Sequence, residues 1–298
     1  MTSDPAAPAS SPLDRVPATA LVLVGIASVQ NGSALARTIF DTAGASGVAL
    51  LRLALSSLLL LAILRPRAWR WDRRSLGAAL LLGVALAGMN QSFYLAIRDV
   101  PLGVAVTVEF VGPLLVALAQ TRRFRDLLWV VSAGLGVALL GLDTSDDIPL
   151  GGLAFALLAG LFWGGYILAS ARVGRLLPGL DGLAVALLVG AVLVLPFGAS
   201  GAGRALVEPA VLLAALGVAV LSSIIPYGAE LAALRRMPTR VFGVLMSLEP
   251  AAAAVAGLVI LGQALGPREL VALLLVSLAS VGVTLGRREG QPPPQPLE

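Results

Sequence analysis

The chain of 298 residues contains no cysteine and no histidine, and all 21 of its basic residues are arginine, so lysine is absent as well. Without cysteine it can form no disulfide, thiolate nucleophile or thiolate metal site. Without histidine it lacks the usual near-neutral acid or base and the commonest metal ligand. Without lysine it cannot form a P-loop, and Ser–His and Ser–Lys protease sites are also excluded. We therefore expect neither an ATP-driven pump nor a protease of these types, and no metal or other cofactor.

Charged residues are scarce too, at 13% of the chain, whereas 58% of the residues are hydrophobic and the mean hydropathy is +0.93. A soluble domain of this length carries about a quarter charged residues. A membrane-spanning helix needs roughly 20 apolar residues, so ten spans would occupy about two thirds of the chain. The composition predicts a membrane protein with many spans, short loops and no sizeable aqueous domain. Its basic pI reflects loop charge and does not indicate a nucleic-acid partner.

Apolar runs alternate with short breaks that contain charged residues, proline or glycine. The proline-rich ends of the chain predict disordered tails at 1–16 and 288–298. The first apolar run also resembles a signal peptide that would be cleaved after Ala36. Acidic residues precede this run, however, and cleavage would leave an odd number of spans, so we expect the run to be retained. The predicted fold is an all-α membrane protein with ten transmembrane helices at 17–36, 45–64, 75–97, 101–120, 125–142, 150–171, 181–198, 209–233, 240–261 and 267–286.

The arginines are distributed unevenly between alternate loops. The loops and tails on the side of the N-terminus hold 16 of them, the opposite loops hold 4, and Arg52 lies inside a span. Cytoplasmic loops of membrane proteins carry an excess of basic residues. The distribution therefore predicts that both termini are cytoplasmic, and the acidic loop at 143–147 falls on the outer side, which fits this orientation.

The chain also repeats itself when it is shifted by 137 residues. Each half, 17–143 and 147–287, would hold five spans, and an odd number means that the second half is inserted upside down. Inverted repeats with an interrupted helix in each half are typical of secondary transporters with a site near the midplane. Pro113 and Pro250 would interrupt these helices, although each proline alone could be a simple packing kink. The matches are Ala96/Ala233, Arg98/Arg235, Pro101/Pro238, Val104/Val241, Pro113/Pro250, Ala117/Ala254 and Ala119/Ala256.

Two longer stretches resemble a signature of the drug/metabolite transporter superfamily with EamA-type domains. They are Pro101–Pro113 (PLGVAVTVEFVGP) and Leu234–Pro250 (LRRMPTRVFGVLMSLEP). The resemblance extends from about Val22 to Arg287 and is closest to the amino-acid exporters of the bacterial inner membrane. It implies two five-helix repeats and proton-driven export of amino acids or related metabolites. Shorter matches are Gln30 with Ala34–Arg37, Leu51–Leu55, Gly88–Asn90 with Phe93–Leu95, and Trp163 with Tyr166–Leu168.

Four ionisable residues lie inside the predicted spans and away from their terminal residues: Arg52, Glu109, Glu230 and Glu249. Such groups usually face a cavity or a partner. At about 1.5 Å rise per residue, Glu109 lies about 12 Å from the outer end of its span and Glu249 about 13 Å from the inner end of its own. Both are therefore near the middle of a core of roughly 30 Å. Without histidine or lysine, a carboxylate is the ordinary side chain left to carry a proton. We expect Glu249 and Glu230 to couple protons and Glu109 to bind substrate, although Glu230 could also be an interfacial ion-pair residue.

A layer of polar residues completes the predicted substrate site. Arg52 could hold a substrate carboxylate with two hydrogen bonds, or it could neutralise Glu109. The side-chain amides of Gln30, Asn31, Asn90 and Gln91 lie at a matching depth, and they would either face the pathway or bond to one another between neighbouring helices. Aromatic residues could line the pathway or simply pack between helices. Those predicted to bind substrate are Tyr94, Trp163 and Tyr166.

These features predict a proton-coupled exporter of small polar amino acids, such as threonine or homoserine, in a bacterial cytoplasmic membrane. Its partners would be the substrate, protons and the lipid bilayer. The alternative within the same fold is efflux of another metabolite or a drug-like cation. An intramembrane enzyme is disfavoured, because lipid and prenyl transferases usually need paired carboxylates with Mg²⁺, and none of the predicted spans carries two acids.

Overall fold

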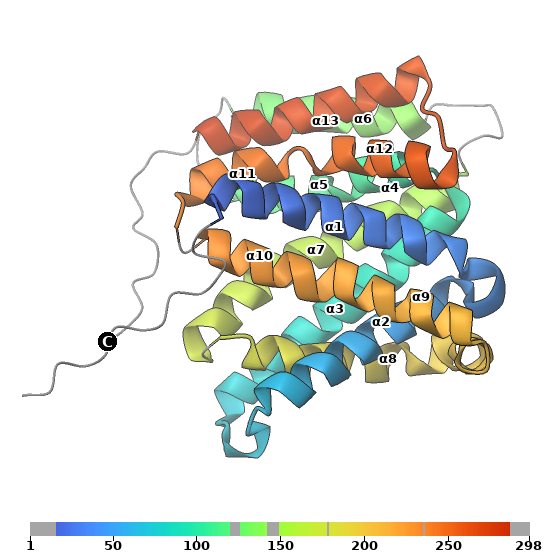
Figure 1. The fold of residues 1–298 in the computed structure, drawn as a ribbon. Helices are drawn as coiled ribbons and strands as arrows, with labels where there is room; N and C mark the ends of the chain where they lie inside the picture. Colours follow the sequence, from blue (N-terminus) through green and yellow to red (C-terminus); the bar gives the residue numbers. More distant parts are fainter. Residues whose placement is uncertain (1–15, 120–125, 142–148, 178, 235, 287–298) are drawn as a thin grey trace, which may run out of the picture.

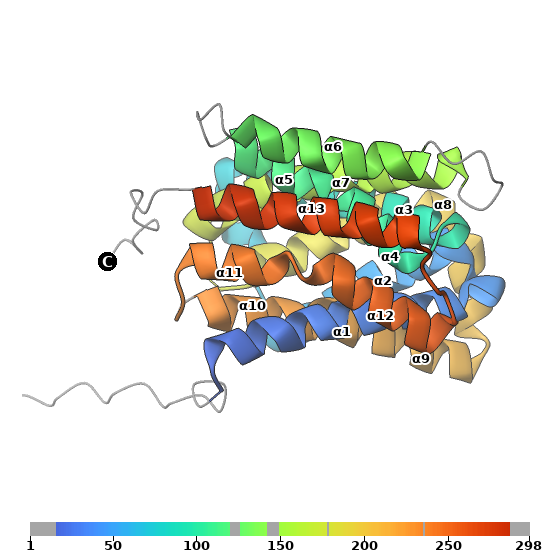
Figure 2. The same ribbon diagram turned by 90° about the horizontal axis from the view of Figure 1, so that it is seen from above.

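The computed structural model describes residues 16–119, 126–141, 149–177, 179–234 and 236–286. The predicted tails, apart from Val16, and the acidic loop at 143–147 lie outside the described residues. Within these ranges every assigned element is helical, and the helices run side by side in one bundle (Figures 1 and 2). Eight helices are long and apolar enough to cross a membrane, and two shorter apolar helices cover Leu102–Val116 and Leu127–Leu140. The expected all-α membrane protein is confirmed.

Most helix bounds fall within a few residues of the predicted spans, because the length of each apolar run sets them. The elements are α1 (Ala18–Thr38), α2 (Phe40–Leu64), the 3-10 turn η2 (Ala68–Arg70), α3 (Arg73–Asp99), α4 (Leu102–Glu109), α5 (Val111–Ala119), α6 (Asp126–Gly141), α7 (Leu150–Leu176), α8 (Asp181–Leu206), α9 (Pro209–Ala219), the π-helical turn η3 (Val220–Ile224), α10 (Ile225–Leu234), α11 (Thr239–Met246), α12 (Glu249–Leu261) and α13 (Pro267–Gly286).

Three predicted bounds were wrong by more than four residues. Helix α2 begins at Phe40 rather than 45, because the chain stays helical on both sides of a kink at Gly44, whose φ of 65° is readily adopted only by glycine. Helix α8 ends at Leu206 rather than 198. It continues through Pro196 because the residues beyond, Gly201 and Ala202, are buried against α2. Helix α7 likewise runs to Leu176 rather than 171.

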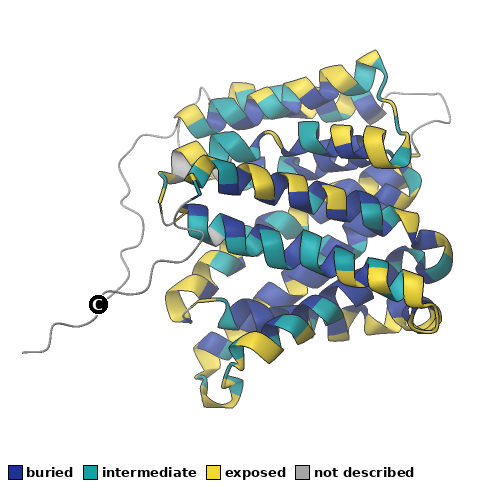
Figure 3. Cartoon of the chain, in the orientation of Figure 1, coloured by how far each residue is buried: buried dark blue, intermediate teal, exposed yellow. Residues whose placement is uncertain are grey.

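Residues that face outward from the bundle are exposed, and those at the contacts between helices are buried (Figure 3). Many of the exposed residues are large and apolar, whereas many of the buried ones are alanine or glycine. Alanine and glycine at such contacts let helix backbones approach closely, as is usual in membranes. An apolar exterior of this extent marks a surface that contacts lipid. Exposed large apolar residues include Leu81 and Val84 of α3, Leu128 and Leu135 of α6, Leu161 of α7, Val192 and Phe197 of α8, Leu213 of α9, Val259 of α12 and Leu274 of α13.

The two halves of the chain are interleaved rather than separate. The most extensive contacts join α2 to α8, α3 to both α7 and α8, α6 to α13 and α1 to α10, and each of these pairs takes one helix from each half. Figure 1 shows the consequence: early (blue) and late (orange) helices alternate across the bundle. A space enclosed at its centre is therefore walled by both halves.

The spans that contain Pro113 and Pro250 are both interrupted. The break between α4 and α5 is at Phe110, and the break between α11 and α12 is at Ser247 and Leu248. Pro113 and Pro250 each lie in the first turn of the helix that follows the break, where a missing N–H costs little. The eight-residue helices before the breaks, α4 and α11, begin at 102 and 239 and end at 109 and 246, so both bounds differ by 137 residues.

Candidate functional site

A cavity of about 110 Å³ lies where the two broken helices meet α1, α2, α3, α7 and α10. It is half-way along the bundle, since Arg52 is the central residue of the 25-residue α2 and Trp163 that of the 27-residue α7. A buried water needs roughly 10–15 Å³ of such space, so the cavity has room for several waters or a small polar solute. Its polar lining residues are Gln30, Ser33, Arg52, Asn90, Glu109, Ser222, Glu230 and Glu249, and its aromatic ones are Phe93, Trp163, Tyr166 and Tyr227.

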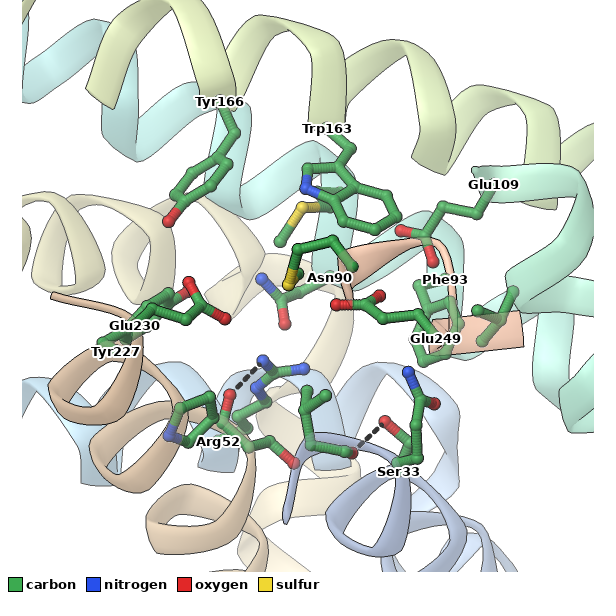
Figure 4. A pocket seen from close by; sticks show the side chains of 17 residues that line it. Ser33, Arg52, Asn90, Phe93, Glu109, Trp163, Tyr166, Tyr227, Glu230 and Glu249 are labelled. Carbon is green, nitrogen blue, oxygen red and sulfur yellow. Dashed lines mark hydrogen bonds between the residues drawn. The ribbon is translucent and has the colours of Figure 1, made fainter. Parts of the chain in front are cut away.

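Three carboxyl groups enter this cavity from three helices. Glu109 is the last residue of α4, Glu249 is the first residue of α12, and Glu230 lies in α10. Figure 4 shows the side chains of Glu109 and Glu249 pointing toward the same region of the cavity, with Glu230 on its other side. None of the three forms an ion pair with Arg52. Burying a charge without a partner is costly, so these groups are suited to hold a proton or the cationic group of a ligand.

Close helix packing positions Glu109. The backbone of α7 at Gly160 lies directly against the break between α4 and α5, so that a Cβ atom at Gly160 would overlap the carbonyl oxygen of Glu109. A Cβ atom at Gly112, just after the break, would likewise overlap the carbonyl oxygen of Gly160. This contact between α5 and α7 requires glycine on both helices, and it fixes the position of the Glu109 backbone at the end of α4.

Arg52 is held by the second half of the chain. Its Nη2 donates a hydrogen bond of 2.7 Å to the carbonyl oxygen of Ser222 (Figure 4). Its Nε donates one of 3.5 Å to Oγ of Ser223. Both serines belong to η3, and a π-helical turn of this kind often marks a functional site. A guanidinium has five N–H donors, so Arg52 retains donors for a carboxylate. Its guanidinium also lies 5.9 Å from the centre of the Tyr94 ring.

Of the residues predicted to bind substrate or couple protons, seven line the cavity: Arg52, Asn90, Glu109, Trp163, Tyr166, Glu230 and Glu249. Trp163 and Tyr166 of α7 each pack against an aromatic ring of another helix or break at the edge of the cavity. The ring of Trp163 lies 5.3 Å from that of Phe110 at the break, and the ring of Tyr166 lies 6.4 Å from that of Tyr227.

The other two predicted substrate residues lie away from the cavity. Gln91 turns toward α2 and donates a hydrogen bond of 2.5 Å to Oγ of Ser46. Tyr94 is fully buried between Phe40 and Phe93. Met89, Asn90 and Phe93 define the cavity face of α3, and Gln91 lies about 100° further around the helix than Asn90, beyond the edge of this face. Ser46 lines a second, more open pocket of about 190 Å³ between the start of α2 and the end of α8.

Several lining residues were not among the predicted site residues. Tyr227 and Ser222 come from the second half, and Ser33 and Phe93 come from the first, whereas Gln30 of the predicted polar layer does line the cavity. The 137-residue shift could have identified some of these lining residues. It relates Asn90 to Tyr227, and Phe93 to the predicted Glu230.

Comparisons with known proteins agree with this architecture. Residues 150–285 match the EamA-like transporter family. Threonine/homoserine exporter RhtA of Escherichia coli (strain K12) is 46% identical over 272 residues, which cover 90% of this chain and 92% of that protein. The chain belongs to the EamA-like transporter family. The exporter of the same name from Salmonella typhimurium (strain LT2) is 46% identical over 275 residues, covering 91% of this chain and 92% of that protein.

One solved crystal structure is similar to this EamA-like chain in fold. It superposes with a TM-score of 0.60 at 18% identity and covers 89% of this chain and 96% of that one. At this identity the likeness concerns the fold alone. The membership confirms the superfamily that the motifs around Glu109 and Glu249 indicated, and it makes this multi-span protein a membrane transporter.

Proposed function

We propose that this chain exports small polar amino acids, such as threonine or homoserine, across the bacterial cytoplasmic membrane in exchange for protons. The observation that carries the proposal is one buried cavity that offers a guanidinium and three carboxyl groups not paired with it. An amino acid is a zwitterion, and its carboxylate and ammonium groups complement Arg52 and the acids. The threonine/homoserine exporters at 46% identity support the same substrate class.

A drug-like cation is the second candidate cargo. Four aromatic residues line the cavity, and aromatic faces attract cations. The buried guanidinium of Arg52 opposes a cargo that carries only positive charge, because nothing in such a cargo would offset the repulsion. The zwitterion satisfies both kinds of lining group and is therefore the better fit.

We also propose ten spans in two inverted repeats, 17–143 and 147–287. The packing supports this arrangement, because the contact of α3 with α7 has a counterpart in that of α10 with α1. Cavity-lining residues occupy related positions as well, so the cavity would lie on the axis between the repeats. These pairs are Met89/Pro226, Asn90/Tyr227, Phe93/Glu230 and Glu109/Met246 at a shift of 137, and Gln30/Trp163 and Ser33/Tyr166 at a shift of 133.

Both chain ends would be cytoplasmic. In Figures 1 and 2 the dark blue start of α1 and the dark red end of α13 lie at the same end of the bundle as the hairpin between α2 and α3. That hairpin carries Arg65, Arg67, Arg70, Arg73 and Arg74. A cluster of this kind favours the cytoplasmic side.

Alternate occupancy of the cavity by cargo and protons would couple the two movements. The protein would change the side to which its cavity opens either with the amino acid bound, when the ammonium group offsets the carboxylate of Glu109, or with Glu249 and Glu230 protonated, because uncompensated buried charge is costly. Protons that enter from the outside would therefore return the empty site to the cytoplasmic side, and their loss there would prepare it for the next amino acid. We assign Glu109 to the ammonium group and Glu249 and Glu230 to the protons. The interrupted helices that carry Glu109 and Glu249 would bend at their breaks as the cavity opens to either side.

Uptake of labelled amino acids into inverted membrane vesicles tests the proposal. In these vesicles export appears as uptake, and an acidic lumen supplies the driving force. Threonine and homoserine should accumulate when the lumen is acidic, and a protonophore should abolish their accumulation. Accumulation of drug-like cations without any amino acid would favour the second candidate. Uptake that is indifferent to the proton gradient would refute the coupling.

A further inference from the structure

The amide of Asn90 presents an unsatisfied acceptor to the cavity. Its side chain is 1% exposed, its Nδ2 donates a hydrogen bond of 2.8 Å to the carbonyl oxygen of Leu86, and its Oδ1 has no partner. The bond to Leu86 fixes the orientation of the amide, because a flipped amide would place two oxygens against each other. Figure 4 shows the Asn90 amide above Arg52, between the side chains of Glu230 and Glu249.

Gln30 provides a second acceptor of the same kind. It lines the cavity from α1, is 3% exposed, and its Oε1 also lacks a partner. A buried acceptor without a hydrogen bond is costly, and such groups in a binding cavity indicate a donor that arrives with the ligand or as water. Two helices therefore direct neutral acceptors into a space that already holds one cation and three acids.

The charged groups of an amino acid do not need these acceptors. Its carboxylate is complemented by Arg52 and its ammonium group by the acids, as proposed above. The neutral amide oxygens are therefore suited to a third polar group of the cargo, one that donates a hydrogen bond without carrying charge. A side-chain hydroxyl meets this requirement, whereas a hydrocarbon side chain would leave the acceptors unpaired.

We infer that Oδ1 of Asn90, assisted by Oε1 of Gln30, accepts the hydroxyl proton of the cargo and selects hydroxyl-bearing amino acids over their hydrocarbon isosteres. This inference rests on the proposed function and adds a specificity determinant to it. Sites that pair with a hydroxyl reject analogues that lack it far more strongly than purely apolar pockets do, because the buried polar groups are left unpaired.

The test compares threonine with valine, which replaces the hydroxyl by a methyl group at nearly constant shape. Purified protein in proteoliposomes exchanges labelled threonine without a proton gradient, and each unlabelled amino acid competes. In the unaltered protein the half-inhibitory concentration of valine should exceed that of threonine at least about tenfold. Asn90→Leu should lower this ratio at least about tenfold, mainly by weakening the binding of threonine, and Gln30→Leu should lower the ratio less.

Asn31→Leu is the matched control. Asn31 neighbours Gln30 on α1, but its side chain is exposed and its Nδ2 bonds to the carbonyl oxygen of Ala27. This variant should keep the ratio of the unaltered protein. The inference is overturned if Asn90→Leu exchanges threonine and still discriminates fully against valine.

The unaltered protein gives an outcome that does not depend on how the variants fold. If it exchanges threonine but valine competes equally, the hydroxyl inference is wrong while the proposed function stands. If it exchanges no amino acid at all, the proposed function itself has failed, and the inference falls with it.

Discussion

Glu109 and Glu249 flank two matching helix breaks from opposite sides and meet at one cavity. Glu109 ends α4 immediately before the break at Phe110, and Glu249 begins α12 immediately after the break at Ser247 and Leu248. The 137-residue shift superposes the breaks, since it relates Phe110 to Ser247, but it does not superpose the acids. This asymmetry supports the proposal of two different duties, one for the ammonium group and one for a proton.

The substitution Arg52→Gln should weaken substrate binding while the protein still folds and inserts. Hydrogen bonds to charged groups are worth about 1.5–3 kcal/mol, so the half-saturating threonine concentration in exchange should rise roughly 10- to 150-fold. The control is Arg204→Gln, which alters an exposed arginine in the last turn of α8 and should leave exchange unchanged. Failure of Arg52→Gln to insert would instead make this arginine a structural residue of the η3 contact.

Glu109→Gln should reduce affinity for the zwitterion about tenfold or more, because a neutral amide replaces the carboxylate that faces the ammonium group. Half-saturation of threonine exchange in proteoliposomes measures the effect. The control is Glu208→Gln, which alters an exposed acid at the start of α9. Unchanged affinity in Glu109→Gln would remove Glu109 from the substrate site.

Gly160→Ala should destabilise the protein through the break that carries Glu109. The added methyl group would overlap the Glu109 carbonyl oxygen, and overpacking of this kind costs typically about 1–3 kcal/mol. Gly174→Ala tests the same exchange on the same helix, where nothing lies within 4 Å of the added carbon. Thermal unfolding of the purified variants should show a lower midpoint for Gly160→Ala only. Equal midpoints would mean that α7 does not fix the break.

The orientation can be tested with single cysteines, because the chain has no cysteine of its own. Trp69, in the arginine-rich hairpin, is 79% exposed, and Val207, after the end of α8, is 78% exposed. A membrane-impermeant maleimide should label Val207→Cys in intact cells and Trp69→Cys only in inverted vesicles. The opposite pattern would place both chain ends outside.

Much of the fold could be predicted from the sequence, because lipid imposes a length on each apolar run and arginine marks the loops. The repeat also predicted that the spans 101–120 and 240–261 are interrupted, and the breaks lie two to three residues before Pro113 and Pro250. The extensions of α2 and α8 could not be predicted, since they depend on a glycine kink and on burial against a neighbouring helix. The π-helical turn that binds Arg52 left no sequence signal either, because its sequence, Val220–Ile224, is an ordinary apolar run with two serines.

The candidate site was predictable in its charges and less so in its neutral groups. Arg52 and the three acids stand out because ionisable groups are rare in spans. Depth alone grouped Asn90 with Gln91, whereas the direction of each side chain around α3 separates them. Tyr227 could have been found by applying the 137-residue shift to Asn90. Ser222 could not, because its role depends on a backbone carbonyl released in η3.

The most direct test of the account compares exchange with driven transport in Glu249→Gln. This variant should bind threonine and exchange it across proteoliposomes at rates near those of the unaltered protein, because Glu109 and Arg52 are intact. It should fail to accumulate threonine against a concentration gradient when an acidic lumen supplies the driving force, since a glutamine cannot carry the proton. Full proton-driven accumulation by Glu249→Gln would contradict the assignment, and the same result for the double variant with Glu109→Gln would end the carboxylate mechanism.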